Sequence, residues 1–209
     1  MLDDCPCYEF SRGLDDELRS ALQGCATRDA IRRVHLLSGS SQLLNSIIFS
    51  IVTKGEGTRL NSVESFALHN YGGSIVDVSL FFSRYRLPKL KCLHLHGCRV
   101  SPWNLVGLQP TNLTSLSLVT SELLPTQALT QLLGILSFNS LLQDLLLSLT
   151  WALHIVDSET SSPVPLPHLR KLNLSDDSFH AFELLNQLEF PDKMDSIDLA
   201  LHGCSPADV

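Results

Sequence analysis

Residues 87–100 read LPKLKCLHLHGCRV, and two kinds of residue alternate along this stretch. Leucines stand at positions 90, 93 and 95, while Cys92, His94 and His96 lie beside them. Successive side chains of a β-strand point to opposite faces of its sheet. The alternation therefore predicts a strand with a buried leucine face and a second face that carries cysteine and histidine.

The leucine spacing L-x-x-L-x-L recurs along the chain. Near-perfect copies begin at residues 90, 113, 142 and 169, and weaker copies begin at 31 and 63. A last copy runs through Ile197, Leu199 and Leu201, with either Met194 or Ser196 in its first position. With Met194 first, successive copies begin 23 to 32 residues apart, an interval that is typical of leucine-rich repeats.

Segments between these strands carry the i, i+3, i+4, i+7 spacing of helices, at residues 44–51, 129–136 and 181–188. We expect another helix over residues 74–85 and a proline- and serine-rich flexible loop over residues 157–168. The predicted fold is an α/β leucine-rich-repeat solenoid. It forms a curved arc, with short parallel strands on the concave face and with helices and irregular returns on the convex face.

Two regions follow from this pattern. Residues 1–29 form an N-terminal lead-in with one short, frayed helix over residues 13–25. Residues 30–209 form the leucine-rich-repeat domain of about seven repeats. A solenoid needs a polar cap over its last apolar face, and the chain stops at SPADV without one, so we expect truncation at the C-terminus.

Composition excludes several classes of function. A formal charge of -7 with only 15 Lys and Arg residues argues against binding to nucleic acid. The acidic opening MLDDCPCYEF lacks the form of a secretory signal. The most apolar stretch, residues 141–156, is 16 residues long and contains Asp144, which is too short and too polar to span a membrane. We expect a cytoplasmic or nuclear protein, or one in both compartments, without a membrane partner.

The cysteines and histidines could indicate a metal site, but their spacing argues against one. Residues 92 and 96 on one strand are separated by about 13 Å, which is too far for one ion to bridge. Cys98 falls in a buried position, and the six cysteines of an unexported chain are expected to be reduced thiols. The pair Cys5 and Cys7 lies near the N-terminus and is weak evidence for a redox or metal site. We predict no metal and no cofactor.

A hydrolytic enzyme is the other chemical alternative. The chain has no G-x-S-x-G elbow or comparable local frame to position a nucleophile, so we predict no catalytic residue and no enzyme activity. The remaining candidate is recognition of a protein by the concave face, which strand alternation assigns to the third, fifth and seventh residues of each repeat. The predicted partner-binding residues are Arg33, His35, His69, Cys92, His94, His96, Ser115, Ser117, Asp144, Lys171, Asn173 and Asp198.

The stretch LPKLKCLHLHGCRVSPWNLVGLQPTNLTSLSL resembles the leucine-rich-repeat region of F-box proteins from mushroom-forming fungi. PTQALTQLLGILSFNSLLQDLLLS resembles the proline-led helix and next strand of those proteins, and residues 184–209 resemble their closing block. The likeness covers residues 60–209 and more loosely the segment from residue 30. It implies the substrate-recognition part of an SCF-type ubiquitin ligase receptor, with an unknown protein substrate on the concave face.

The chain departs from that family at its start. An F-box has about 40 residues with a leucine-proline opening, and nothing between Met1 and Ala30 has that form. The Skp adaptor and cullin are therefore expected partners only if an F-box exists outside this chain. The alternative is a stand-alone repeat scaffold with no link to ubiquitin, and a metal-dependent or hydrolytic enzyme is the remote one.

Overall fold

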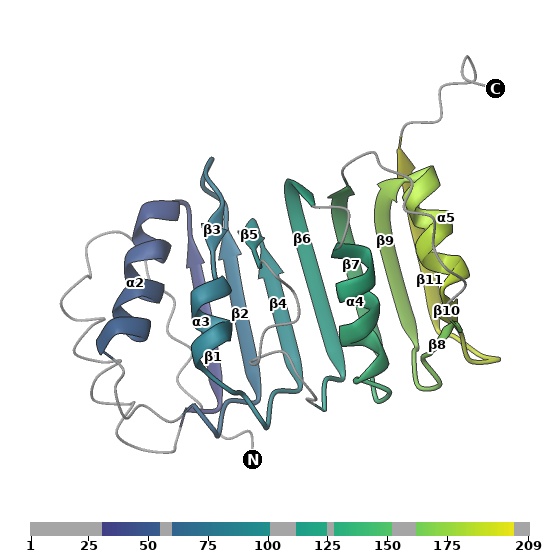
Figure 1. The fold of residues 1–209 in the computed structure, drawn as a ribbon, viewed down its shortest axis with the longest axis horizontal. Helices are drawn as coiled ribbons and strands as arrows, with labels where there is room; N and C mark the ends of the chain where they lie inside the picture. The colour runs from purple at the N-terminus through teal and green to yellow at the C-terminus, as the bar shows by residue number, and fades with distance from the viewer. Residues whose placement is uncertain (1–30, 55–59, 101–111, 125–127, 152–161, 203–209) are drawn as a thin grey trace.

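The computed structural model describes residues 31–54, 60–100, 112–124, 128–151 and 162–202 and centres on one seven-stranded parallel sheet (Figure 1). The strand order β1-β2-β4-β6-β7-β9-β11 places each strand beside the next one in the chain. The predicted α/β fold with short parallel strands is thus confirmed. The strands are β1 (Arg33–Ser38), β2 (Ser65–Asn70), β4 (Cys92–His96), β6 (Ser115–Leu124), β7 (Asp144–Trp151), β9 (Lys171–Asp177) and β11 (Ser196–His202).

Backbone hydrogen bonds repeat at the start of every strand. The Lys91 carbonyl oxygen accepts from the N–H groups of Thr114 and Ser115 at 2.8 and 3.0 Å. Five other carbonyls accept the same pair of bonds from the segment that follows in the sheet. The six accepting residues are Arg32, Glu64, Lys91, Thr114, Gln143 and Arg170. Each stands second in a copy of the leucine pattern, so neighbouring copies meet with the same backbone geometry.

A tight turn precedes four of these strands. The N–H of Leu90 donates to the carbonyl oxygen of Leu87 at 3.0 Å, and equivalent bonds join residues 63 to 60, 142 to 139 and 169 to 166. The accepting residue is a buried leucine in three turns and Asn139 in the fourth. The Asn139 side chain donates to the Ile135 carbonyl oxygen at 2.7 Å and accepts from the Leu113 N–H at 3.2 Å. These bonds satisfy the buried amide.

Four helices lie on one face of the sheet (Figure 1). Their apolar faces and the leucines of the strands form one continuous core. Because a helix buries a stripe at every third or fourth residue, the observed spacing places that stripe against the strands. The helices are α2 (Ser41–Lys54), α3 (Ser79–Arg84), α4 (Ala128–Ser137) and α5 (Ser178–Asn186).

Three local predictions need correction. The helix expected over residues 74–85 is only α3, because β3 (Val76–Asp77) precedes it and pairs with β5 (Cys98–Arg99). The periodic stretch 181–188 is helical only to residue 186. Its last residue starts β10 (Leu188–Glu189), which pairs with β8 (Val164–Pro165) inside the expected loop. Residues 157–161 of that loop and the predicted helix 13–25 lie outside the described residues.

A buried amide stabilises the N-terminal half of the sheet. Asn70 accepts from the Ser41 hydroxyl at 3.0 Å, and its Nδ2 donates to the carbonyl oxygens of Ser74 at 2.7 Å and Gly97 at 2.9 Å. Gly97 has a φ of 64°, and a Cβ there would lie 2.5 Å from the Asn70 carbonyl oxygen. Only glycine fits both the backbone angle and this close approach.

The last strand settles the register that the sequence left open. Ile197 pairs with Leu172 and Leu199 with Leu174, so Met194, not Ser196, occupies the first position of that copy. The register puts the apolar side chains of β11 in line with the core. Ile197, Leu199 and Leu201 are nevertheless 55%, 45% and 42% exposed, because no described element lies beyond this strand.

Candidate protein-binding surface

The sheet face opposite the four helices is called the open face here, because no described helix or strand covers it. Strand register aligns its side chains in three rows, at the third, fifth and seventh positions of each copy. The third-position row is Arg33, Ser65, Cys92, Ser115, Asp144, Lys171 and Ser196. The fifth-position row is His35, Ala67, His94, Ser117, Leu146, Asn173 and Asp198. The seventh-position row is Leu37, His69, His96, Val119, Ser148, Ser175 and Ala200.

All twelve predicted binding residues fall in these rows. The structure therefore brings them onto one surface, although they come from seven strands. Ser117 differs from the expectation, because it is only 6% exposed. The His96 ring covers it, with Nε2 hydrogen bonded to the serine Oγ at 2.8 Å. Ser117 supports a neighbouring ring rather than forming an open contact point.

Four histidines gather on three adjacent strands, and we call His35, His69, His94 and His96 the imidazole cluster. His69 and His96 are register partners, and their rings are tilted by 56° to one another with centroids 4.4 Å apart. His35 and His94 each lean toward a serine of the next strand. Their Nε2 atoms are 3.3 Å from the Ser65 Oγ and 3.1 Å from the Ser115 Oγ.

One offset relates all three histidine–serine pairs. In each pair the serine is the register partner of the residue two places before the histidine. Three histidine rings are thus hydrogen bonded to the next strand with the same offset in register. The Nδ1 atoms of His94 and His96 make no hydrogen bond to a described residue. The same holds for each ring nitrogen of His69. All three residues are half-buried, so part of each side chain is open to solvent.

Burial and crowding lower the pKa values of His69, His94 and His96. Burial, together with the neighbouring His69 and His94, lowers the pKa of His96 to about 4. The pKa of His94 is lowered by burial and by His69 and His35, with Asp144 acting in the opposite direction. Burial and His35 lower the pKa of His69 as well. Protonation of one ring is unfavourable because the new positive charge is partly removed from water and lies close to the other imidazoles.

The two sides of the open face differ in charge. On β1, β2 and β4 the three rows hold one arginine, four histidines and no carboxylate. On β6, β7, β9 and β11 they hold two aspartates, one lysine and mainly small or amide side chains. Lys171 and Asp144 are 4.0 Å apart there, and both side chains are exposed. The histidine side is the only part of this surface, as described, that could become strongly cationic.

Two cysteines, Cys92 and Cys98, lie among the described residues near the imidazole cluster. No group of three or more His, Cys, Asp or Glu side chains among the described residues could hold an ion. Cys98 is 6% exposed and packs in the core, as its position predicted. Burial raises its pKa to about 12, so the thiol stays protonated. Cys92 is half-buried in the third-position row, and Cys5 and Cys7 lie outside the described residues.

Sequence reasoning missed several members of the surface. Leu37 is 44% exposed in the seventh-position row, and Leu146 stands between Ser117 and Asn173 in the fifth-position row. Strand alternation alone places both on the open face, although neither was among the predicted binding residues. Tyr71, beyond the end of β2, is 69% exposed and stacks near His69 with centroids 6.3 Å apart. No repeat position pointed to it.

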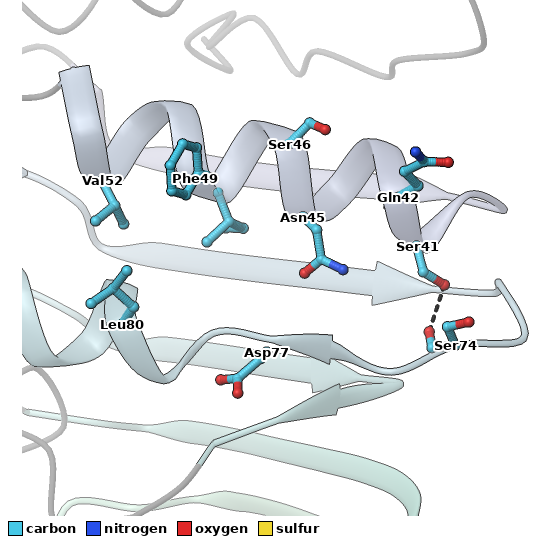
Figure 2. A pocket seen from close by; sticks show the side chains of 10 residues that line it. Ser41, Gln42, Asn45, Ser46, Phe49, Val52, Ser74, Asp77 and Leu80 are labelled. Atoms are coloured by element: carbon cyan, nitrogen blue, oxygen red, sulfur yellow. Dashed lines mark hydrogen bonds between the residues drawn. The ribbon is translucent and has the colours of Figure 1, made fainter.

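A groove of about 570 Å³ lies on the helix side, between α2 and the segment from Ser74 to Leu80 (Figure 2). Figure 2 shows Phe49 and Leu80 at one end and the Ser41–Ser74 hydrogen bond at the other. Its one titratable lining group is Asp77, which accepts from the Ser79 N–H at 2.9 Å and pairs with Arg99 at 3.1 Å. The described lining places no nucleophile beside a base.

Within the described residues, no helix has the length and apolar character needed to cross a membrane. Comparison of the chain with models of known protein families, with curated proteins and with solved structures found no match.

Proposed function

We propose that this chain is a leucine-rich-repeat module that binds a protein on its open face and performs no chemistry. The supporting observation is the register of the sheet, which gives three straight rows of mostly polar side chains over seven strands. Such a surface offers many hydrogen-bonding groups at fixed spacing. That suits recognition of an extended or folded protein surface.

In this proposal the chain is a curved arc, and the open face is its concave side. Helices take more room than strands, so stacked strand–helix units bend with the strands inside. The repeating carbonyl bonds at the strand starts support a stacked arrangement, because each copy meets the next one in the same way.

The likeness to fungal F-box proteins adds a biological setting to the proposal. The chain would hold the substrate of an SCF-type ubiquitin ligase, in the cytoplasm or nucleus. Two free thiols, Cys92 and Cys98, agree with a reducing compartment. The Skp adaptor and cullin would join only through an F-box outside residues 1–209.

Site-specific photo-crosslinking tests the binding surface. A benzophenone side chain would replace His94 or Asn173 on the open face, and Thr130 on the exposed side of α4 would serve as the control. We expect the same partner protein to crosslink from both open-face positions and not from Thr130. Equal crosslinking from all three positions, or different proteins from the two open-face positions, would refute the assignment.

The ubiquitin setting needs a separate test. The full gene product, purified from cells of its own source, is expected to carry Skp and cullin in stoichiometric amounts. If both are absent while the crosslinked partner is present, the chain is a repeat scaffold without a ligase link.

A further inference from the structure

The imidazole cluster is unusual for this chain because it forms an acid-free patch on an acidic protein. The chain carries a net charge of -7, yet no Asp or Glu stands in the three rows of β1, β2 and β4. Arg33 is the permanent charge there. A ligand that approaches these three strands meets one cation and four imidazoles, and the open-face carboxylate that acts on the cluster is Asp144 of β7.

We infer that an acidic segment of the partner protein lies across this side of the open face and that its carboxylates accept hydrogen bonds from the imidazoles. The inference rests on the proposed binding function and names the chemistry that the partner must bring. It also predicts regulation, because a protonated imidazole pairs more strongly with a carboxylate than a neutral ring does.

Distances along the strands favour an extended acidic segment. His94 and His96 are two residues apart on β4, which separates their side chains by about 6.6 Å along the strand. Alternate residues of an extended peptide have the same separation. An extended segment with an acidic residue at every second position would place one carboxylate on each imidazole.

The charged surroundings of the cluster are limited. Glu64 and Lys91, just before β2 and β4, are paired with each other at 3.0 Å. From the C-terminal half, Asp144 faces His94 and is itself near Lys171. Among the described residues in the rows of β1, β2 and β4, the histidines are the side chains whose ordinary pKa lies between pH 5.5 and 7.5. The pH response of binding therefore reports the cluster.

The sign of the response follows from linkage. In the free protein the pKa values of His69, His94 and His96 are lowered, so the rings are neutral at pH 7.5. A carboxylate beside a ring raises its pKa, so binding takes up protons and tightens as the pH falls. The attraction also weakens as salt increases, because the cluster is partly exposed to solvent.

Binding of a defined peptide provides the test. The probe is a fluorescein-labelled ten-residue peptide in which Glu alternates with Ser, and fluorescence anisotropy gives its Kd at pH 7.5, 6.5 and 5.5 at constant ionic strength. We expect Kd to fall at least about tenfold from pH 7.5 to 5.5. The same peptide with Gln in place of Glu should show no such change.

A triple variant and its control assign the response to the cluster. H69Q/H94Q/H96Q keeps hydrogen-bonding side chains but removes three of the four imidazoles of the cluster, and it should lose most of the pH response. Thr130→Gln, on exposed α4, should retain it. Calorimetry of the wild-type chain in two buffers of different ionisation enthalpy measures proton uptake directly, so the result does not depend on how well the triple variant folds.

Three results would overturn the inference: a Kd that does not change with pH, a pH response that persists undiminished in the triple variant, and equally tight binding of a ten-nucleotide oligothymidylate with the same pH response. Failure here is distinguishable from failure of the proposed function. A partner that crosslinks from His94 but binds independently of pH would leave the binding module intact and reject only its acidic ligand.

Discussion

The two edge strands of the sheet carry similar apolar patterns in opposite surroundings. On β1 the core-facing Leu36 is 3% exposed, because α2 packs over that end of the sheet (Figure 1). On β11 the core-facing Leu199 is 45% exposed, although α5 contacts the strand. A leucine in the right register is therefore buried only where a following element covers it. At the two edges of the sheet, burial of a core-facing leucine depends on the element that packs over the strand rather than on the sequence of the strand itself.

The largest predicted effect tests that difference directly. Leu36→Ala should lower the free energy of unfolding by about 2–5 kcal/mol, since it leaves a cavity under α2. Leu199→Ala should lower it by less than about 1 kcal/mol, because much of that side chain is already in water. Leu174→Ala, the register partner of Leu199 and 1% exposed, is the matched control and should behave like Leu36→Ala.

Urea unfolding followed by circular dichroism measures all three variants under one set of conditions. Equal losses for Leu36→Ala and Leu199→Ala would mean that something covers β11 in solution, and the comparison of the two edges would fail.

Two glycines, one in each half of the molecule, are expected to respond to alanine substitution in opposite ways. Gly97→Ala, in the N-terminal half, should lower the free energy of unfolding by about 1–3 kcal/mol, from the positive φ and the approach to Asn70. Gly134→Ala, inside α4, should raise it by about 0.5–1 kcal/mol, because a Cβ there meets nothing within 4 Å and alanine favours the helix. A lower thermal midpoint for Gly97→Ala and a higher one for Gly134→Ala would support both predictions. A neutral Gly97→Ala would contradict it.

The leucine pattern made the sheet predictable because each strand is locally encoded. The spacing at residues 90, 93 and 95 specifies one apolar face, and repetition specifies parallel neighbours in chain order. The turn at Asn139 was not predictable in this way. There a polar residue replaces a buried leucine, and its role depends on carbonyl and N–H groups 4 and 26 residues away.

The candidate surface was also predictable only in part. Strand alternation placed His94 and His96 on the open face, but it could not pair either ring with a serine of the next strand. Those contacts depend on register between strands 21 residues apart in sequence. Burial of Ser117 and exposure of Leu37 are likewise set by neighbours. Alternation predicts the direction of a side chain and leaves its surroundings undetermined.

The pH dependence of stability should come mainly from the N-terminal half. His69, His94 and His96 have pKa values below the unfolded value, so the unfolded chain binds more protons as the pH falls below about 6.5. Stability is therefore full above pH 6.5 and falls between pH 6.5 and about 4.

His96→Gln should reduce that loss by about 1 kcal/mol or less, because the ring is only half-buried and solvent screens part of the effect. Urea midpoints at pH 7.5, 6, 5 and 4.5 measure it. The pKa of Glu64 is lowered from 4.5 by its bond with Lys91, so its contribution is lost at lower pH than that of the histidines. An unchanged slope in His96→Gln between pH 6.5 and 5 would place the titration elsewhere.

The smallest predicted effect lies in the C-terminal half of the open face. Lys171 and Asp144 are 4.0 Å apart with side chains 63% and 48% exposed, so water and salt screen their attraction. Lys171→Gln should change the free energy of unfolding by less than about 0.5 kcal/mol, and 0.5 M NaCl should remove even that difference. Lys193→Gln, an exposed lysine without an ion pair to any described residue, is the matched control. A loss above 1 kcal/mol that persists in salt would show that this half is held by charge pairing, and that the contrast with the hydrogen-bonded N-terminal half is smaller than the structure indicates.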